Sequence, residues 1–91
     1  MNLFGIVRVL GSVQSFENTE FKKRTIIVES VESKTPYSVD FINNKIQTID
    51  DLLLGSFVKI EVNIKGNYDK KDKTRVYNSF EAKNLIVLDS N

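Results

Sequence analysis

The stretch from Asn43 to Lys65 constrains the fold most, because its hydrophobic period changes from that of a helix to that of a strand. In its first half, apolar residues recur about every three or four positions, as on one face of a short amphipathic helix. In its second half they alternate with polar residues, as in a strand with one buried and one wet face. The helical set is Ile46, Ile49, Leu52 and Leu53, and the alternating set is Val58, Ile60, Val62 and Ile64.

Both ends of the predicted helix carry residues that are common at helix termini. Asn44 is of a type that caps helix N-termini. Gly55 lies just beyond the last periodic residue, where a left-handed residue often ends a helix. We therefore expect a helix capped by Asn44, followed by a left-handed Gly55 and then a strand.

Four further segments have strand character, and polar turn sequences separate them. The first is long, and Gly5 and Gly11 mark places where it can bend or admit a neighbouring backbone. In the last, the alternation slips near Lys83-Asn84, as at a β-bulge. These strands are predicted over residues 3–13, 22–32, 37–42 and 75–88, with a polar loop over residues 66–74. Val7 and Val9 are predicted to share one face of the first strand, which carries apolar residues on both faces. The packing residues of the later strands are predicted to be Ile26, Val28, Val39, Phe41 and Phe80, in addition to the alternating set above.

Five strands with one short helix between the third and the fourth predict an all-β closed barrel. As an open sheet they would leave bare edges, whereas a barrel removes the edges and the helix closes one end. This arrangement is the OB fold, a five-stranded Greek-key barrel. An SH3-like barrel also has five strands, but a helix of about two turns in this position fits it less well. Residues 1–91 are expected to form one such domain.

The residue types of the chain exclude several kinds of chemistry. It has no cysteine, and therefore neither disulfides nor thiolate metal sites. It also has no histidine, which is the usual general base and the commonest metal ligand. Asn67, Asp69 and Asp72 resemble a calcium loop only faintly, because the glycine and the closing glutamate are missing. We therefore expect no catalytic residue, metal site, cofactor or small-molecule substrate.

The hydropathy pattern predicts no association with a membrane. No apolar run approaches about 18 residues, the length needed for a membrane-spanning helix. The N-terminus lacks the basic region of a signal peptide and has strand character. The expected location is the bacterial cytoplasm or nucleoid, or the host cytoplasm if a phage encodes the protein.

Charge is segregated along the chain although it nearly cancels overall. Thirteen basic and twelve acidic residues leave a formal net charge of +1. One basic cluster is Lys22–Arg24, and the second consists of Lys65, Lys70, Lys71, Lys73 and Arg75. OB barrels bind ligands on the face of strands two and three and on the loops joining strands one to two and four to five. Both clusters fall at these predicted loops.

Aromatic residues lie beside both clusters, which is the strongest functional signal in the sequence. Binding of single-stranded DNA needs a cationic groove for phosphates and aromatic platforms for bases. Structural roles are the alternative for Phe21, which opens a strand, and for Tyr37, which shares a face with Val39 and Phe41. A lysine-rich loop taken alone is usually only solvated. The predicted nucleic-acid-binding residues are Phe16, Phe21, Lys22, Lys23, Arg24, Tyr37, Tyr68, Lys70, Lys71, Lys73, Arg75 and Tyr77.

Four runs of the sequence carry a resemblance that covers nearly the whole chain. They are FKKRTIIVE, YSVDFINNKI, LLLGSFVKIEVNIKG and RVYNSFEAKNLIVL. Their layout resembles that of bacterial and phage single-stranded-DNA-binding proteins. More closely, Phe21-Lys22-Lys23, Asp40-Phe41 and Ala82-Lys83 resemble motifs of a family of short, uncharacterised bacterial and phage OB-type domains.

Two features depart from the well-studied single-strand binders. Those proteins recruit repair proteins through a long tail with acidic and aromatic residues, whereas this sequence ends at Asp89-Ser90-Asn91. Recruitment through a tail is therefore not expected. Their base-stacking tryptophans are also missing, and Phe and Tyr stand in their place.

Two functions remain open at this point. The first is largely sequence-nonspecific binding of single-stranded DNA, with RNA as an alternative ligand, in replication, recombination or repair. The second is an OB-fold module for protein interaction or assembly that does not bind nucleic acid, which the near-zero net charge favours. A homodimer or a higher oligomer is compatible with both.

Overall fold

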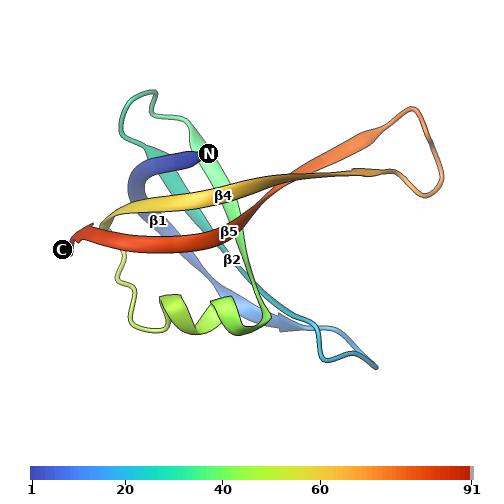
Figure 1. Ribbon diagram of the computed structural model, residues 1–91, viewed down its shortest axis with the longest axis horizontal. Helices are drawn as coiled ribbons and strands as arrows, with labels where there is room; N and C mark the ends of the chain where they lie inside the picture. The colour runs from blue at the N-terminus through green and yellow to red at the C-terminus, as the bar shows by residue number, and fades with distance from the viewer. Residues whose placement is uncertain (91) are drawn as a thin grey trace.

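The computed structural model describes residues 1–90 and shows five strands closed into a barrel in the order β1-β2-β3-β5-β4 (Figure 1). The elements are β1 (Asn2–Ser15), β2 (Lys22–Ser30), β3 (Pro36–Ile42), the 3₁₀ helix η1 (Asn43–Ile49), β4 (Phe57–Tyr68) and β5 (Val76–Asp89). Neighbouring strands are antiparallel except β3 and β5, which pair in parallel through Val39–Phe80 and Asp40–Glu81. The predicted five-stranded OB barrel, with its helix between β3 and β4, is confirmed.

The barrel core is built from the inward faces of all five strands, with η1 covering one end. Ile26, Val28, Val39 and Phe41 are buried as predicted. The alternation in β4 is confirmed for Val58, Ile60 and Val62, which are also buried. It is wrong for Ile64, which is 59% exposed because β4 continues beyond the barrel at that point.

Strand β1 bends because extra residues interrupt its pairing with β2. Arg8 is unpaired between Val7–Val28 and Val9–Ile27, so the side chains after it change face. Val7 is therefore buried while Val9 is exposed, and the prediction that they share one face is wrong. A second irregularity follows at Gly11 and Ser12. The predicted long, bent first strand is confirmed.

Gly5 provides the close approach of strands expected from the sequence. A Cβ atom at this position would lie 2.5 Å from both the Glu29 carbonyl oxygen and Cγ1 of Val28. We expect Gly5→Ala to lower the free energy of unfolding by about 1–3 kcal/mol, because strand backbone must move to relieve the overlap. Gly66→Ala is the matched control, since its Cβ would meet only side-chain atoms, Asn78 Oδ1 at 3.3 Å and Val76 Cγ1 at 3.9 Å. Equal urea midpoints for the two variants would contradict the proposed constraint at Gly5.

The helix is shorter and tighter than its hydrophobic pattern predicts. It begins at Asn43, and Ile42 occupies the N-cap position, so the prediction of an Asn44 cap is wrong. Ile46 and Ile49 are buried, whereas Leu53 follows the helix and is exposed. Among residues 1–90, no helix is long and apolar enough to cross a membrane.

Gly55 has the expected left-handed conformation, but in a turn beyond the helix. Its φ is 86°, and its N–H donates a hydrogen bond to the Val7 carbonyl oxygen at 2.8 Å. The Val7 N–H in turn donates to the Ser56 carbonyl oxygen at 3.0 Å. This turn therefore joins the helix to β4 and ties it to the middle of β1.

The β4–β5 hairpin extends further than predicted. Pairing continues to Tyr68–Val76, so Gly66, Asn67 and Tyr68 are strand residues and the prediction of a loop beginning at residue 66 is wrong. The predicted bulge is confirmed: Glu61 pairs with Asn84 and Val62 with Ala82, which leaves Lys83 unpaired. The far end of the hairpin projects well beyond the barrel (Figure 1).

Candidate nucleic-acid interface

Two arms project from the same side of the barrel and carry the two basic clusters (Figure 1). The β1–β2 arm is residues 13–24, in which Val13 pairs with Arg24 and Ser15 with Lys22. The β4–β5 arm is residues 64–79, the part of that hairpin beyond the pairs of Phe80 and Glu81 with β3. The structure thus places both predicted basic loops at one end of the molecule, with a space between their tips.

At the tip of the β1–β2 arm, two phenylalanines and a lysine form one cluster. The Phe16 and Phe21 rings are 5.2 Å apart between centroids and are tilted by 53°. Lys23 Nζ lies 6.0 Å from the centroid of the Phe16 ring, the outer limit of a cation–π contact. Both rings remain about two-fifths exposed. The cluster therefore offers an aromatic surface beside a positive charge.

A hydrogen-bonded turn brings these two rings together. The Thr19 N–H and hydroxyl both donate to the Phe16 carbonyl oxygen, at 3.2 and 3.0 Å. The Phe21 N–H donates to the Thr19 hydroxyl oxygen at 3.2 Å. Asn18, at the centre of the turn, has a φ of 63°, a conformation that asparagine tolerates better than most residues. The turn fixes Phe16 against Phe21 without using the exposed faces of the rings.

The two other basic residues of this arm have different surroundings. Arg24 Nε donates to the Gly11 carbonyl oxygen at 2.7 Å, so the side chain ties the two strands together at the bend of β1. The Lys22 backbone N–H donates to Asn43 Oδ1 at 2.8 Å, while the side chain remains exposed. Lys22 is therefore placed to meet a phosphate, and Arg24 has a structural contact in addition to its charge.

The tip of the β4–β5 arm is ordered around the Asp69 carboxylate. It accepts hydrogen bonds from the Lys71 N–H at 2.8 Å, the Tyr77 hydroxyl at 2.9 Å and the Asp72 N–H at 3.2 Å. These bonds lower the pKa of Asp69 below its ordinary value of 3.8. The Thr74 hydroxyl and N–H lower the pKa of Asp72 in the same way. Both carboxylates thus shape the loop that presents its lysines to solvent.

The lowered pKa of Asp69 predicts the direction of a pH effect on this loop. A depressed folded-state pKa means that the bonds stabilise the loop above the unfolded pKa and are lost as pH falls through the folded value. We expect the amide chemical shifts of Lys71 and Asp72 to change with a midpoint below 3.8. In Asp69→Asn the change at Lys71 should be largely lost, whereas the Asp72 amide should still respond to its own carboxylate, whose pKa is also lowered. A midpoint above the ordinary value would show that the carboxylate is not held in this way.

Tyr68 and Tyr77 lie on opposite faces of the β4–β5 arm. Tyr68 pairs with Val76 and Tyr77 with Asn67, and adjacent cross-strand pairs point to opposite faces of a hairpin. Tyr68 is 69% exposed and shares its face with Ile64. The Tyr77 hydroxyl is held by Asp69. The structure therefore does not bring the two tyrosines together into one stacking surface.

Tyr37 lies in the barrel wall, away from the tips of the arms. It packs against the core, and its ring meets the Phe80 ring edge to face, at 5.4 Å between centroids and 88° between planes. This geometry is that of a packing contact between aromatic side chains. The geometry fits the structural alternative for Tyr37 better than a stacking role.

Within the described residues no cation of the arms forms a salt bridge, although Glu17, Glu20, Asp69 and Asp72 lie on the same arms. Among residues 1–90, the one salt bridge joins Arg8 to Glu29 at 3.6 Å, outside both arms. The outer face of β2 and β3 differs, because the Thr25 hydroxyl donates to Asp40 Oδ1 at 2.7 Å and this face carries acidic side chains. Positive charge and exposed aromatic surface are therefore concentrated on the arms, and the sheet face between them is mixed.

Residues 2–85 match the model of a family described as Domain of unknown function (DUF3127), a match that covers most of the chain. The chain belongs to this family. No curated protein matches it. The expected likeness to a short, uncharacterised domain is thus confirmed for this DUF3127 domain, and the family description names no activity.

Sequence reasoning missed two features of the DUF3127 site. One is the apolar face of the β4–β5 arm, where Ile64, Tyr68 and Val76 are all exposed. The alternating pattern of β4 carries the signal for this face, since the pattern continues past the last barrel residue. From the sequence alone, Ile64 is assigned to the barrel wall instead. The other is Asn43, whose side chain links η1 to the β1–β2 arm and whose contact depends on residues distant in sequence.

Proposed function

We propose that this DUF3127 domain binds single-stranded DNA, largely without regard to sequence, in replication, recombination or repair. The observation that carries the proposal is the pair of arms on one side of the OB barrel, each with cations free of salt bridges beside exposed aromatic rings. Cationic tracks and aromatic platforms are the two features that sequence-tolerant single-strand binding requires. RNA is the alternative ligand, because both features also suit an RNA strand.

In the proposed complex, each arm supplies both phosphate contacts and a stacking surface. Lys22 and Lys23 on one arm and the lysines of the other arm meet phosphates, and each contact makes binding more sensitive to salt. Bases stack on the Phe16–Phe21 cluster and on Tyr68. Each stacked base contributes about 1–3 kcal/mol. Stacking is available to every base, which explains a weak dependence on sequence.

Titration of a fluorescently labelled oligo-dT tests the proposal, and Tyr68→Ala tests its geometry. We expect saturable binding at low salt, and a loss of about 1–3 kcal/mol of binding free energy in the variant. The melting temperature should barely change, because the Tyr68 side chain is mostly exposed. Tyr68→Phe retains the ring and should retain the affinity. Absence of saturable binding at low salt, with both DNA and RNA, would refute the proposal.

A second candidate function is a protein-interaction module. It is favoured by exposed apolar side chains on the turn before β4 and on the end of β5, where Phe57 pairs with Asp89. These side chains are Leu53, Leu54, Val87 and Leu88. Such a module would capture a protein in a pull-down and ignore oligonucleotides. Size-exclusion mass, measured with and without oligo-dT, distinguishes it from the DNA-binding function.

A further inference from the structure

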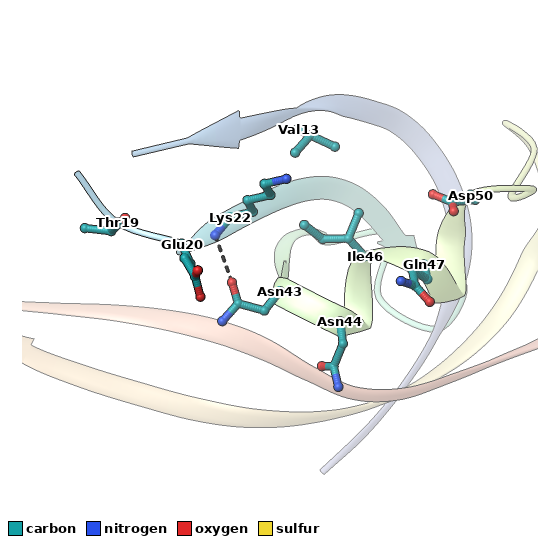
Figure 2. Close-up of a pocket in the computed structure, with 9 residues that line it drawn as sticks. All are labelled: Val13, Thr19, Glu20, Lys22, Asn43, Asn44, Ile46, Gln47 and Asp50. Atoms are coloured by element: carbon teal, nitrogen blue, oxygen red, sulfur yellow. Dashed lines mark hydrogen bonds between the residues drawn. The ribbon is translucent and has the colours of Figure 1, made fainter. Parts of the chain in front are cut away.

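A groove of about 750 Å³ lies between the root of the β1–β2 arm and η1 (Figure 2). It adjoins the surface to which we assign strand binding, but neither the basic clusters nor the stacking rings account for it. Its lining includes Glu20, Lys22, Asn43, Ile46, Gln47 and Asp50. The volume is in the range of small-ligand sites and exceeds that of one nucleobase.

The lining combines an apolar floor with a rim of hydrogen-bonding groups. Val13 and Ile46 supply the apolar surface, and Ile46 is itself part of the core. Figure 2 shows Glu20 and Lys22 near Asn43 at one end, and Gln47 and Asp50 at the other. An apolar floor suits the face of a planar ring, and convergent polar groups suit its edge.

Asn43 is held in a fixed orientation at the rim. Its φ is 51°, in the left-handed region, and its Oδ1 accepts the Lys22 N–H at 2.8 Å. Because the oxygen is engaged in this way, the amide NH₂ group is the part left to donate to a ligand. Asparagine tolerates this conformation better than most residues. The rim is thus partly preorganised before any ligand binds.

The charged residues of the groove favour a base over a phosphate as its ligand. Glu20 and Asp50 outnumber Lys22 in the lining, so an uncharged base suits the groove better than a phosphate. Carboxylates accept hydrogen bonds from exocyclic amines, which cytosine and adenine carry and thymine replaces with the O4 acceptor. Amide side chains such as Asn44 and Gln47 can both donate to and accept from a base edge.

We propose that this groove accepts one unstacked base bearing an exocyclic amine, splayed out of the strand bound by the arms. The inference rests on the proposed function, because the strand delivers the base. Lys22 belongs to both the groove and the β1–β2 arm, so the backbone next to the inserted base passes the cations of that arm. The domain then binds any strand, with a preference at one position for amine-bearing bases over thymine.

Comparing the affinities of two homopolymers tests the preference for amine-bearing bases. Labelled oligo-dC and oligo-dT of equal length, about 12 nucleotides, are titrated into the protein at one salt concentration. We expect oligo-dC to bind about fivefold or more tightly, the discrimination typical of a specific base-edge contact. In the double variant Glu20→Ala/Asp50→Ala the ratio should fall to about one, because both carboxylate acceptors of the groove are gone. All the replaced side chains are exposed, so folding should not change.

Asp51→Asn is the matched control, because it removes an adjacent exposed carboxylate that does not line the groove. It should retain the wild-type ratio. If both homopolymers bound and the ratio of their affinities were the same in the wild type and the double variant, the base preference of the groove would be refuted. Strand binding by the arms would not. If neither homopolymer bound, the proposed strand binding and the proposed base site would both be refuted. A shift of the Asn44 and Gln47 side-chain amide signals with cytidine monophosphate, but not thymidine monophosphate, would support the assignment directly.

Discussion

Replacing Lys70, Lys71, Lys73 and Arg75 by Gln is expected to weaken oligo-dT binding by about two to three orders of magnitude at 0.1 M salt. All four residues are exposed at the tip of the β4–β5 arm. Each phosphate contact to a single strand contributes about 0.7 to the slope of log K against log salt, so losing four lowers the slope by about 3. The measurement is a set of fluorescence titrations across a salt series.

The control for this variant keeps the same change in net charge. Replacing four lysines outside the two arms by Gln removes four positive charges from other parts of the barrel. These are Lys34, Lys45, Lys59 and Lys83. This control should lose little affinity and retain its salt slope, because contact rather than overall charge determines counterion release. Equal losses in the two variants would show that the β4–β5 arm is not a phosphate-binding track.

The fold was predictable from sequence because its core signals are local. Period-two alternation in β4 and the inward pair Ile26 and Val28 reflect burial on one face, which requires no knowledge of partner strands. The bulge at Lys83 was visible as a slip in that alternation. The helix position was visible as a change of period, although its 3₁₀ geometry and its start were not. A barrel then followed from the order of the elements.

The candidate site was less predictable because it depends on register. Sequence placed Tyr68 and Tyr77 near one another, but only the pairing of Tyr68 with Val76 shows that they face opposite ways. Ile64 continues the alternation of β4 whether its face meets the core or solvent, so the pattern alone cannot show where the barrel ends. The Arg24–Gly11 hydrogen bond depends on the bend of β1. The sequence pattern locates that bend only approximately.

Phe41→Ala is expected to be the most destabilising single substitution considered. The side chain is 1% exposed and is among the largest fully buried side chains of residues 1–90. Truncating a buried phenylalanine costs about 3–5 kcal/mol, which is most of the stability expected for a small domain. The urea midpoint should fall sharply, and a large unfolded fraction is expected without denaturant. Phe41→Leu leaves a smaller cavity and provides a measurable intermediate if the alanine variant does not fold.

Phe16→Ala is the comparison that separates core packing from the arms. Phe16 is exposed and packs mainly on Phe21, so its loss should cost no more than about 0.5–1.5 kcal/mol, the contribution of an aromatic pair. Because Phe16 belongs to the stacking surface, the same variant should nevertheless weaken oligo-dT binding. Phe41→Leu should show the reverse: lower stability, with affinity retained in the folded fraction. If Phe16→Ala destabilised the domain as much as Phe41→Leu, the β1–β2 arm would be part of the core and its aromatic cluster unavailable to bases.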